Sequence, residues 1–154
     1  GGFTDCLLQR GAARVYAVDV GYGQFEWRLR QDPRVVLMER TNVRYLEPGA
    51  IAEPIDLIVI DVSFISLTLV LPAVVSYLAV AGSIITLIKP QFEVGKGLVG
   101  RGGIVRDDGL RESTVEKVVS CAMHLGLQLA GRMESPIEGR KGNREFLAWF
   151  QRTT

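Results

Sequence analysis

Three ionisable residues stand at the ends of apolar runs, where side chains can do proton chemistry. Asp61 and Lys89 each come directly after such a run, and Glu145 comes directly before one. The runs cover residues 55–60, 83–88 and 146–150. In an open α/β sheet, ligands and chemistry gather at the edge formed by the carboxyl ends of the parallel strands. We therefore expect Asp61, Lys89 and Glu145 to converge on one active site.

The elements around these residues predict an α/β fold with a mostly parallel sheet. Short apolar runs alternate with helix-length segments, and this alternation implies parallel strands with right-handed crossovers. The predicted strands are 14–19, 34–38, 55–60 and 83–88, and the predicted helices are 6–10, 24–31 and 66–79. Farther along, a helix at 110–125 and strands at 127–133 and 145–151 predict a closing antiparallel hairpin.

The composition is that of one domain with a real hydrophobic core. The chain has 154 residues, of which 47% are hydrophobic, and we expect residues 1–154 to form a single domain. The formal net charge of +1 does not by itself imply a nucleic-acid partner. Basic residues nevertheless gather in the last third, where they form either a phosphate-facing rim or an ordinary solvated surface. They are Arg101, Arg106, Arg111, Arg132, Arg140, Lys141 and Arg144.

The cysteines and the histidine indicate neither a disulfide framework nor a metal site. Cys6 and Cys121 lie in helix-like segments without Cys-x-x-Cys spacing, so we interpret both as buried thiols. No Ser-His-Asp set or metal-ligand set can be built around His124, the only histidine in the sequence. No signal peptide is visible, and the expected location is cytoplasmic.

One uncharged stretch has the length of a membrane span. Residues 62–88 carry no Asp, Glu, Lys or Arg, and a transmembrane helix needs about 20 apolar residues. However, Pro72 and the pair Gly82-Ser83 divide the stretch into a helix-length piece and a β-branched piece of strand length. Strands of a parallel sheet are covered on both faces and are continuously apolar. We therefore expect no membrane segment.

A nucleotide-type site is indicated near the start of the chain. Asp19 ends the predicted strand 14–19, and Gly1-Gly2 precede it at about the spacing of a glycine loop. A carboxylate at this position accepts hydrogen bonds from ribose hydroxyls, although Asp19 could instead cap a helix or turn. The G-x-G-x-x-G string at 95–100 is not interpreted as a cofactor loop, because no strand precedes it and no helix opens from it.

Two strings carry a family resemblance. Asp-Val-Ser-Phe at 61–64 and Lys-Pro-Gln-Phe-Glu at 89–93 resemble the catalytic segments of the FtsJ-like ribose 2'-O-methyltransferases, specifically the TlyA branch, which is often labelled haemolysin. The resemblance implies a Rossmann-like class I methyltransferase fold, S-adenosylmethionine as cofactor, and ribosomal RNA or a ribosomal subunit as partner. It places the last three members of the family's Lys-Asp-Lys-Glu tetrad on Asp61, Lys89 and Glu145. It implies cofactor contacts at Gly1, Gly2, Asp19, Asn42 and Asp61.

Some parts of that family's architecture have no counterpart in this sequence. The first lysine of the tetrad, the first strand of the sheet and a small S4-type RNA-binding domain normally lie upstream of the glycine loop. We therefore expect a sheet that is open between the strands at 14–19 and 55–60, and no methyl transfer by the 154-residue chain alone.

Two alternatives of other classes remain open. A membrane-active haemolysin would need residues 62–88 to leave the core, and Asp61 and Lys89 bracket that segment. A binding module could instead hold an adenosine-containing ligand without chemistry. Ligand binding without turnover would separate this module from an enzyme.

Overall fold

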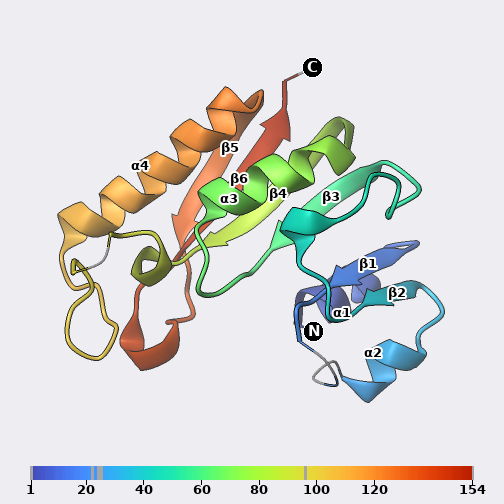
Figure 1. Cartoon of the computed structure of the whole chain (residues 1–154), viewed down its shortest axis with the longest axis horizontal. Coiled ribbons are helices and arrows are strands. Elements are labelled where there is room, and N and C mark those ends of the chain that lie inside the picture. The colour runs from blue at the N-terminus through green and yellow to red at the C-terminus, as the bar shows by residue number, and fades with distance from the viewer. Residues whose placement is uncertain (1, 22, 24–25, 96, 154) are drawn as a thin grey trace. The chain divides into compact units, whose positions relative to one another are not determined.

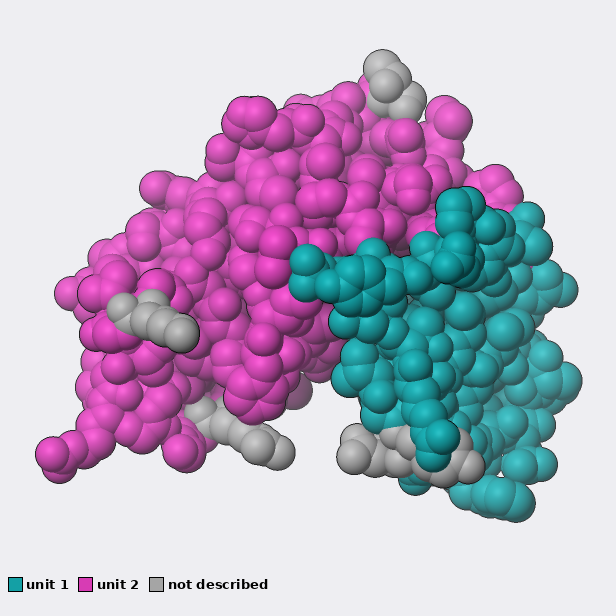
Figure 2. Space-filling view, viewed as in Figure 1, with its two compact units in different colours: residues 1–52 teal, residues 53–154 magenta. Residues whose placement is uncertain are grey.

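The chain divides into two compact units, each with its own sheet. The computed structural model describes residues 2–21, 23, 26–95 and 97–153, without the side chain of Arg140. The first unit covers residues 1–52 and the second covers residues 53–154 (Figure 2). Within the described residues, the strands form a two-stranded sheet in the first unit and a four-stranded sheet in the second. The single domain expected for residues 1–154 stays a prediction.

The first unit is built from two helices and two parallel strands (Figure 1). Its small core consists of Leu8, Val15 and Leu29, which the helices and the first strand contribute. Its elements are α1 (Gly2–Gln9), β1 (Val15–Val18), α2 (Trp27–Gln31), β2 (Val35–Met38) and the 3₁₀ turn η1 (Val43–Tyr45). The first helix begins at Gly2, four residues earlier than predicted, and its first turn contains Asp5, which suits the positive end of the helix dipole.

The second unit is a four-stranded mixed sheet with two helices side by side on one face (Figure 1). The strand order is β3-β4-β6-β5, with β3 and β4 parallel and the other two pairs antiparallel. Its elements are β3 (Ile55–Ile60), α3 (Leu67–Val74), β4 (Leu78–Ile88), α4 (Asp108–His124), β5 (Leu127–Glu134) and β6 (Phe146–Arg152). Three 3₁₀ turns complete it: η2 (Val75–Tyr77), η3 (Pro90–Phe92) and η4 (Arg140–Gly142).

This arrangement confirms the predicted fold class. The parallel pairs β1-β2 and β3-β4 and the closing antiparallel hairpin β5-β6 all form. The core of the second unit follows the period-two pattern of strands, because alternate side chains of β4 and β6 face the helices. These buried residues are Ile84, Thr86, Ile88, Phe146, Ala148 and Phe150. In the described residues no strand pairs β1 or β2 with the four-stranded sheet, and the position expected for the missing family strand, between β1 and β3, stays a prediction.

The uncharged stretch 62–88 belongs to the second unit. It contains α3, η2 and the whole of β4. None of the helices in the described part of the chain is long and apolar enough to cross a membrane. The fourth strand begins at Leu78, five residues before its predicted start. Its pairing with β3 is interrupted by a bulge, because Ile55 lies opposite Leu78 but Leu57 lies opposite Ser83.

The prediction that both cysteines are buried was wrong for Cys6, which is exposed. Thr4 and Leu8 form the buried face of α1, and Cys6 lies between them in sequence, on the other side of the helix. Cys121 is half-buried on α4, and its thiol approaches the carbonyl of Thr68 at 4.0 Å. Burial raises the pKa of the Cys121 thiol, which therefore behaves as a packing residue.

The N-terminus of α4 gives a test of local stability. The Asp107 carboxylate caps this helix by accepting a hydrogen bond of 3.0 Å from the backbone N–H of Leu110. Replacing Asp107 with Ala should lower the free energy of unfolding by about 1 kcal/mol, measured by urea denaturation. Asp107→Ser keeps a capping oxygen and should retain most of the stability. Equal losses in the two variants would contradict the capping role.

Candidate active site

Asp61 and Lys89 meet at the carboxyl ends of two neighbouring strands. Asp61 follows β3 directly and Lys89 follows β4 directly. The Lys89 ammonium lies 2.7 Å from Oδ1 of Asp61 and donates a second hydrogen bond of 3.1 Å to Oγ of Ser63. The lysine side chain is only 15% exposed, whereas that of Asp61 is 44% exposed. Two oxygen acceptors thus fix the cation, and solvent can reach the one that belongs to Asp61.

Strand pairing brings the backbone of Glu145 near that of Lys89, but its side chain bonds to a residue other than the lysine. It directly precedes Phe146, which pairs with Ile88, the residue before Lys89. Its carboxylate is buried and accepts a hydrogen bond of 2.8 Å from Nε2 of Gln91. In the described part of the chain, no ion pair within 4.0 Å joins Glu145 to Lys89. Glu145 therefore reaches the lysine-bearing segment through Gln91 rather than through the ammonium.

The surroundings of Glu145 leave little freedom for its carboxylate. A Cβ atom at position 139 would overlap the Glu145 carboxyl group, so a larger residue there would force this side chain to shift. The backbone carbonyl of Glu145 accepts a hydrogen bond of 2.8 Å from the N–H of Ser135. The other amide atom of its partner, Oε1 of Gln91, is buried without a hydrogen-bond partner among the described residues.

Two further contacts join the segments that follow β3 and β4. The rings of Phe64 and Phe92 lie with their centroids 4.8 Å apart. The Glu93 carboxylate accepts hydrogen bonds of 2.6 Å from Oγ of Ser66 and 2.8 Å from the N–H of Leu67. Phe64 has a positive φ of 64°, which is costly for a bulky residue and persists only where neighbouring contacts hold it. Ser63, Gln91 and Glu93 lie in the two strings that carry the family resemblance, but the sequence alone assigned no role to them.

In the first unit, Asp19 lies at the carboxyl end of β1. Its Oδ1 accepts a hydrogen bond of 2.9 Å from the N–H of Gly21. Its backbone continues the pairing with the second strand, because its N–H donates to the carbonyl of Met38 at 3.0 Å and its carbonyl accepts from Thr41 at 2.9 Å. Asp19 is therefore held rigidly at a strand end, and it also forms the turn that its alternative interpretation required.

The other expected cofactor residues of this unit are less constrained. Asn42 is exposed and caps the turn η1, where its Oδ1 accepts a hydrogen bond of 3.0 Å from the N–H of Arg44. Gly2 is the first residue of α1, so the N–H groups of the first helical turn begin there. Gly1 lies outside the described residues. Asp61, the remaining expected contact, belongs to the second unit.

The glycine string at 95–100 lies between a 3₁₀ turn and a helix. It follows η3 rather than a strand, and the next helix, α4, begins only at Asp108. The N–H of Gly100 donates a hydrogen bond of 2.8 Å to the carbonyl of Ile104, which closes a turn on this segment. The described part of this segment thus lacks the strand and helix of a dinucleotide fingerprint, and its role as a substrate-facing segment stays a prediction.

The basic rim is neutralised in part by carboxylates. Three of its arginines form ion pairs on the surface of the second unit, and a hydrogen bond from Arg132 lowers the pKa of Glu112 below its usual value. These pairs favour the solvated-surface alternative for the three arginines. The pairs are Arg111 with Asp108 at 2.6 Å, Arg132 with Glu112 at 2.7 Å and Arg144 with Glu134 at 2.5 Å.

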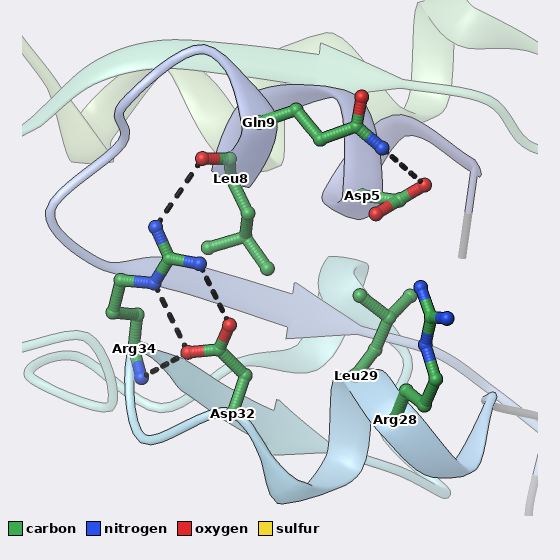
Figure 3. A pocket seen from close by; sticks show the side chains of 7 residues that line it. All are labelled: Asp5, Leu8, Gln9, Arg28, Leu29, Asp32 and Arg34. Carbon is green, nitrogen blue, oxygen red and sulfur yellow. Dashed lines mark hydrogen bonds and ion pairs between the residues drawn. The ribbon is translucent and has the colours of Figure 1, made fainter.

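The first unit also contains a cavity that none of the expected cofactor residues lines (Figure 3). It has a volume of about 260 Å³, and its charged walls include the ion pair of Arg34 with Asp32. Arg34 donates to both oxygens of Asp32, at 3.0 and 2.8 Å, and to the carbonyl of Leu8 at 3.2 Å. The lining residues are Asp5, Leu8, Gln9, Arg28, Leu29, Asp32 and Arg34.

The ion pair in this cavity predicts that Asp32 titrates at a lower pH than a free aspartate. Hydrogen bonds from the Arg34 side chain and backbone lower the pKa of Asp32 from 3.8 to about 2. A lowered pKa means that the charged carboxylate favours the folded state above pH 3.8, and that this contribution is lost as the pH falls through about 2. Carbon-detected NMR titration should therefore give a midpoint near 2 for Asp32, and Arg34→Gln should raise it. An unchanged midpoint in that variant would contradict the pairing.

The fold is that of the class I methyltransferases. The structure resembles that of the N-methyltransferase NodS from Bradyrhizobium japonicum, with a TM-score of 0.68 over 100% of this chain and 74% of that chain. The sequences are only 18% identical, so this likeness concerns the fold alone. The model of the FtsJ-like methyltransferases matches residues 1–152. The chain therefore belongs to the FtsJ-like methyltransferase family.

Closer relatives cover the whole of this chain. It is 53% identical over 154 residues to the 16S/23S rRNA (cytidine-2'-O)-methyltransferase TlyA of Mycobacterium tuberculosis, of which it spans 58%. It also matches a solved structure described as "Putative hemolysin from Streptococcus thermophilus", with a TM-score of 0.95 and 48% identity. That match covers 99% of this chain and 56% of the other. The chain thus spans somewhat more than half the length of these two relatives.

Proposed function

We propose that the complete protein transfers a methyl group from S-adenosylmethionine to a ribose 2'-hydroxyl of ribosomal RNA. The observation that carries this proposal is the cluster of Lys89, Asp61 and Ser63 at the carboxyl ends of β3 and β4. Membership of the FtsJ-like family supports methyl transfer, and the named activity of the TlyA relative supports a ribose 2'-oxygen of rRNA as the acceptor. The cytoplasmic location expected for this protein stays a prediction.

The residues of the first unit fit the hydroxyl groups of a nucleoside cofactor. Oδ1 of Asp19 is used by Gly21, but Oδ2 takes no hydrogen bond within the described residues and is free to accept one from a ribose hydroxyl. Gly2, Asp19 and Asn42 of the first unit would hold the cofactor, and the expected contacts at Gly1 and Asp61 stay predictions. When bound, S-adenosylmethionine supplies an electrophilic methyl group.

The second unit provides the groups that act on the acceptor. A ribose 2'-hydroxyl is a poor nucleophile, and its reaction requires a positioned group that takes or holds its proton. Lys89 is the candidate for this role. Asp61 and Ser63 occupy two of the three positions on its nitrogen, and in the deprotonated amine the third position is the lone pair that would take the hydroxyl proton. Glu145, through Gln91, would stabilise the backbone segment that carries the lysine.

Replacing the lysine tests the chemical step. In the complete protein, Lys89→Ala should abolish methylation of ribosomal RNA while leaving the affinity for S-adenosylmethionine nearly unchanged, because the lysine acts on the hydroxyl. Incorporation of a radiolabelled methyl group and calorimetric titration of the cofactor measure the two quantities. Retained turnover would show that another group handles the proton.

A charge-preserving variant separates two possible roles of the lysine. Lys89→Arg keeps a cation beside Asp61, but a guanidinium does not release its proton in proteins. If proton transfer is the function of Lys89, this variant should be as inactive as Lys89→Ala. Substantial activity in Lys89→Arg would instead show that only the positive charge is required.

If Asp19 contacts the cofactor, removal of its carboxylate should weaken cofactor binding. Asp19→Ala should weaken binding of S-adenosylmethionine by about 1.5–3 kcal/mol, the range for a hydrogen bond to a charged acceptor. A contact made equally in the ground and transition states affects binding more than the chemical rate, so turnover at saturating cofactor should change little. Calorimetry on the complete protein measures the dissociation constant. An unchanged constant would remove Asp19 from the site.

The non-catalytic and membrane-active alternatives make different predictions for the same protein. A binding module would bind S-adenosylmethionine without any methyl incorporation into RNA. A membrane-active protein would release dye from lipid vesicles, although residues 62–88 contribute α3 and β4 to the core of the second unit. The hemolysin name of the Streptococcus thermophilus relative is the observation that keeps the vesicle assay worthwhile.

A further inference from the structure

A buried and multiply hydrogen-bonded carboxylate of the second unit has no part in the proposed chemistry. Glu93 lies four residues after Lys89, and its side chain is 2% exposed. Burying an ionised carboxylate is unfavourable unless it is paired and hydrogen-bonded. Glu93 therefore requires an extensive set of partners, and they show which parts of the protein it holds together.

The first set of partners lies at the N-terminus of α3. Ser66, the N-cap of this helix, donates to Oε1 of Glu93 at 2.6 Å, and the N–H of Leu67 donates to Oε2 at 2.8 Å. The first turn of α3 contains no acidic residue of its own. Glu93 thus supplies, from another segment, both the acceptor and the negative charge that the start of a helix favours.

The second partner comes from α4. The ammonium of Lys117 lies 3.1 Å from Oε1 of Glu93 and also donates a hydrogen bond of 2.5 Å to the backbone carbonyl of Glu93. It balances the buried charge and fixes the backbone at the same point. Glu93 consequently joins the end of the lysine-bearing segment to both helices of the unit.

The contacts between the two segments follow their order in sequence. Lys89 bonds to Asp61 and Ser63 at one end of the paired segments 61–67 and 89–93. The two phenylalanine rings, at 64 and 92, lie in the middle. Glu93 bonds to residues 66 and 67 at the other end. The buried Glu93 contacts therefore fix the register of a pairing whose other end is the Lys89 ammonium.

We propose that Glu93 is a positioning residue for the methyl transfer. This inference rests on the proposed function, because Lys89 must be the group that acts on the hydroxyl. Glu93 touches no reacting atom. It holds the segment 89–93 on the start of α3, and this contact sets the position of the Lys89 ammonium relative to Asp61.

The test compares Glu93→Gln with a control that removes hydrogen bonds elsewhere in the same unit. Arg152 donates to the carbonyls of Val75 and Leu78, at 3.1 and 2.8 Å, and within the described residues no hydrogen bond or ion pair joins its side chain to either segment. In the complete protein, Glu93→Gln should lower the single-turnover methylation rate by about 100-fold, the loss expected for a displacement near 1 Å. Its KM for S-adenosylmethionine should change less than about threefold, because the cofactor contacts are elsewhere. Arg152→Met should lower the melting temperature but leave the rate unchanged.

The outcomes separate this inference from the proposed function. An inactive wild-type protein would contradict the proposed function itself. Active wild type with an undiminished rate in Glu93→Gln would overturn only the positioning role, as would an equal loss of rate in Glu93→Gln and Arg152→Met. If Glu93→Gln does not fold, Ser66→Ala replaces it, since it removes one donor to Glu93 and should lower the rate about fivefold to tenfold. No loss of rate in folded Ser66→Ala would overturn the inference.

A double variant shows whether Glu93 acts through the lysine. Ser63→Ala removes one of the two acceptors that hold the Lys89 ammonium. If Glu93 and Ser63 both act through the position of Lys89, the rate loss in Ser63→Ala/Glu93→Gln should be smaller than the product of the two single losses. Losses that multiply would show independent effects and would overturn the positioning role.

Discussion

The parallel pairing of β3 with β4 is the constraint on which the candidate active site depends. Ile60 lies opposite Thr86 in this register, so the residue after β3 would face position 87 if the pairing continued. Lys89 lies two residues farther along, about 6.6 Å at the rise of a parallel strand. A lysine side chain can span that distance back towards Asp61, whereas a shorter side chain could not. A slip of one residue would send the side chain to the opposite face of the sheet.

Two buried carboxylates hold the segment that follows β4. Glu145 accepts from Gln91 near the start of this segment, and Glu93 accepts from the first turn of α3 at its end. Each buried carboxylate needs its partners, because an unpaired charge in the interior is costly. The segment therefore has few alternative conformations. This rigidity accounts for the persistence of the left-handed backbone at Phe64 on the facing segment, whose ring touches that of Phe92.

The sequence was sufficient for the features that depend on periodicity and on strand ends. The strand at 55–60 forms with the expected bounds, and the proximity of Asp61 and Lys89 followed from the geometry of parallel strands. Contacts that depend on loop conformation could not be predicted in this way. The choice of Gln91 rather than Lys89 as the hydrogen-bond donor to Glu145 depends on the turn η3, which begins at Pro90.

Burial was predictable only where both faces of an element could be inferred. The apolar run in β4 fixed its own interior position, but the exposure of Cys6 depends on which face of α1 the core of the first unit covers. The multiple partners of Glu93 were equally out of reach, since an acidic residue in a glycine-rich loop is exposed far more often than buried. A buried acid in such a loop becomes recognisable only when its donors from two helices are seen.

The electrostatics of the second unit separate into buried pairs that fix geometry and exposed pairs that can be exchanged. Arg144 and its partner Glu134 are each more than 40% exposed, so their ion pair contributes little to stability and is screened by salt. A phosphate group could replace the carboxylate at small cost. The contacts of Glu93 cannot be exchanged in this way, because its displacement would leave a charge in the interior. An exchange of surface ion pairs such as Arg144 with Glu134 therefore leaves the segment that carries Lys89 in its conformation.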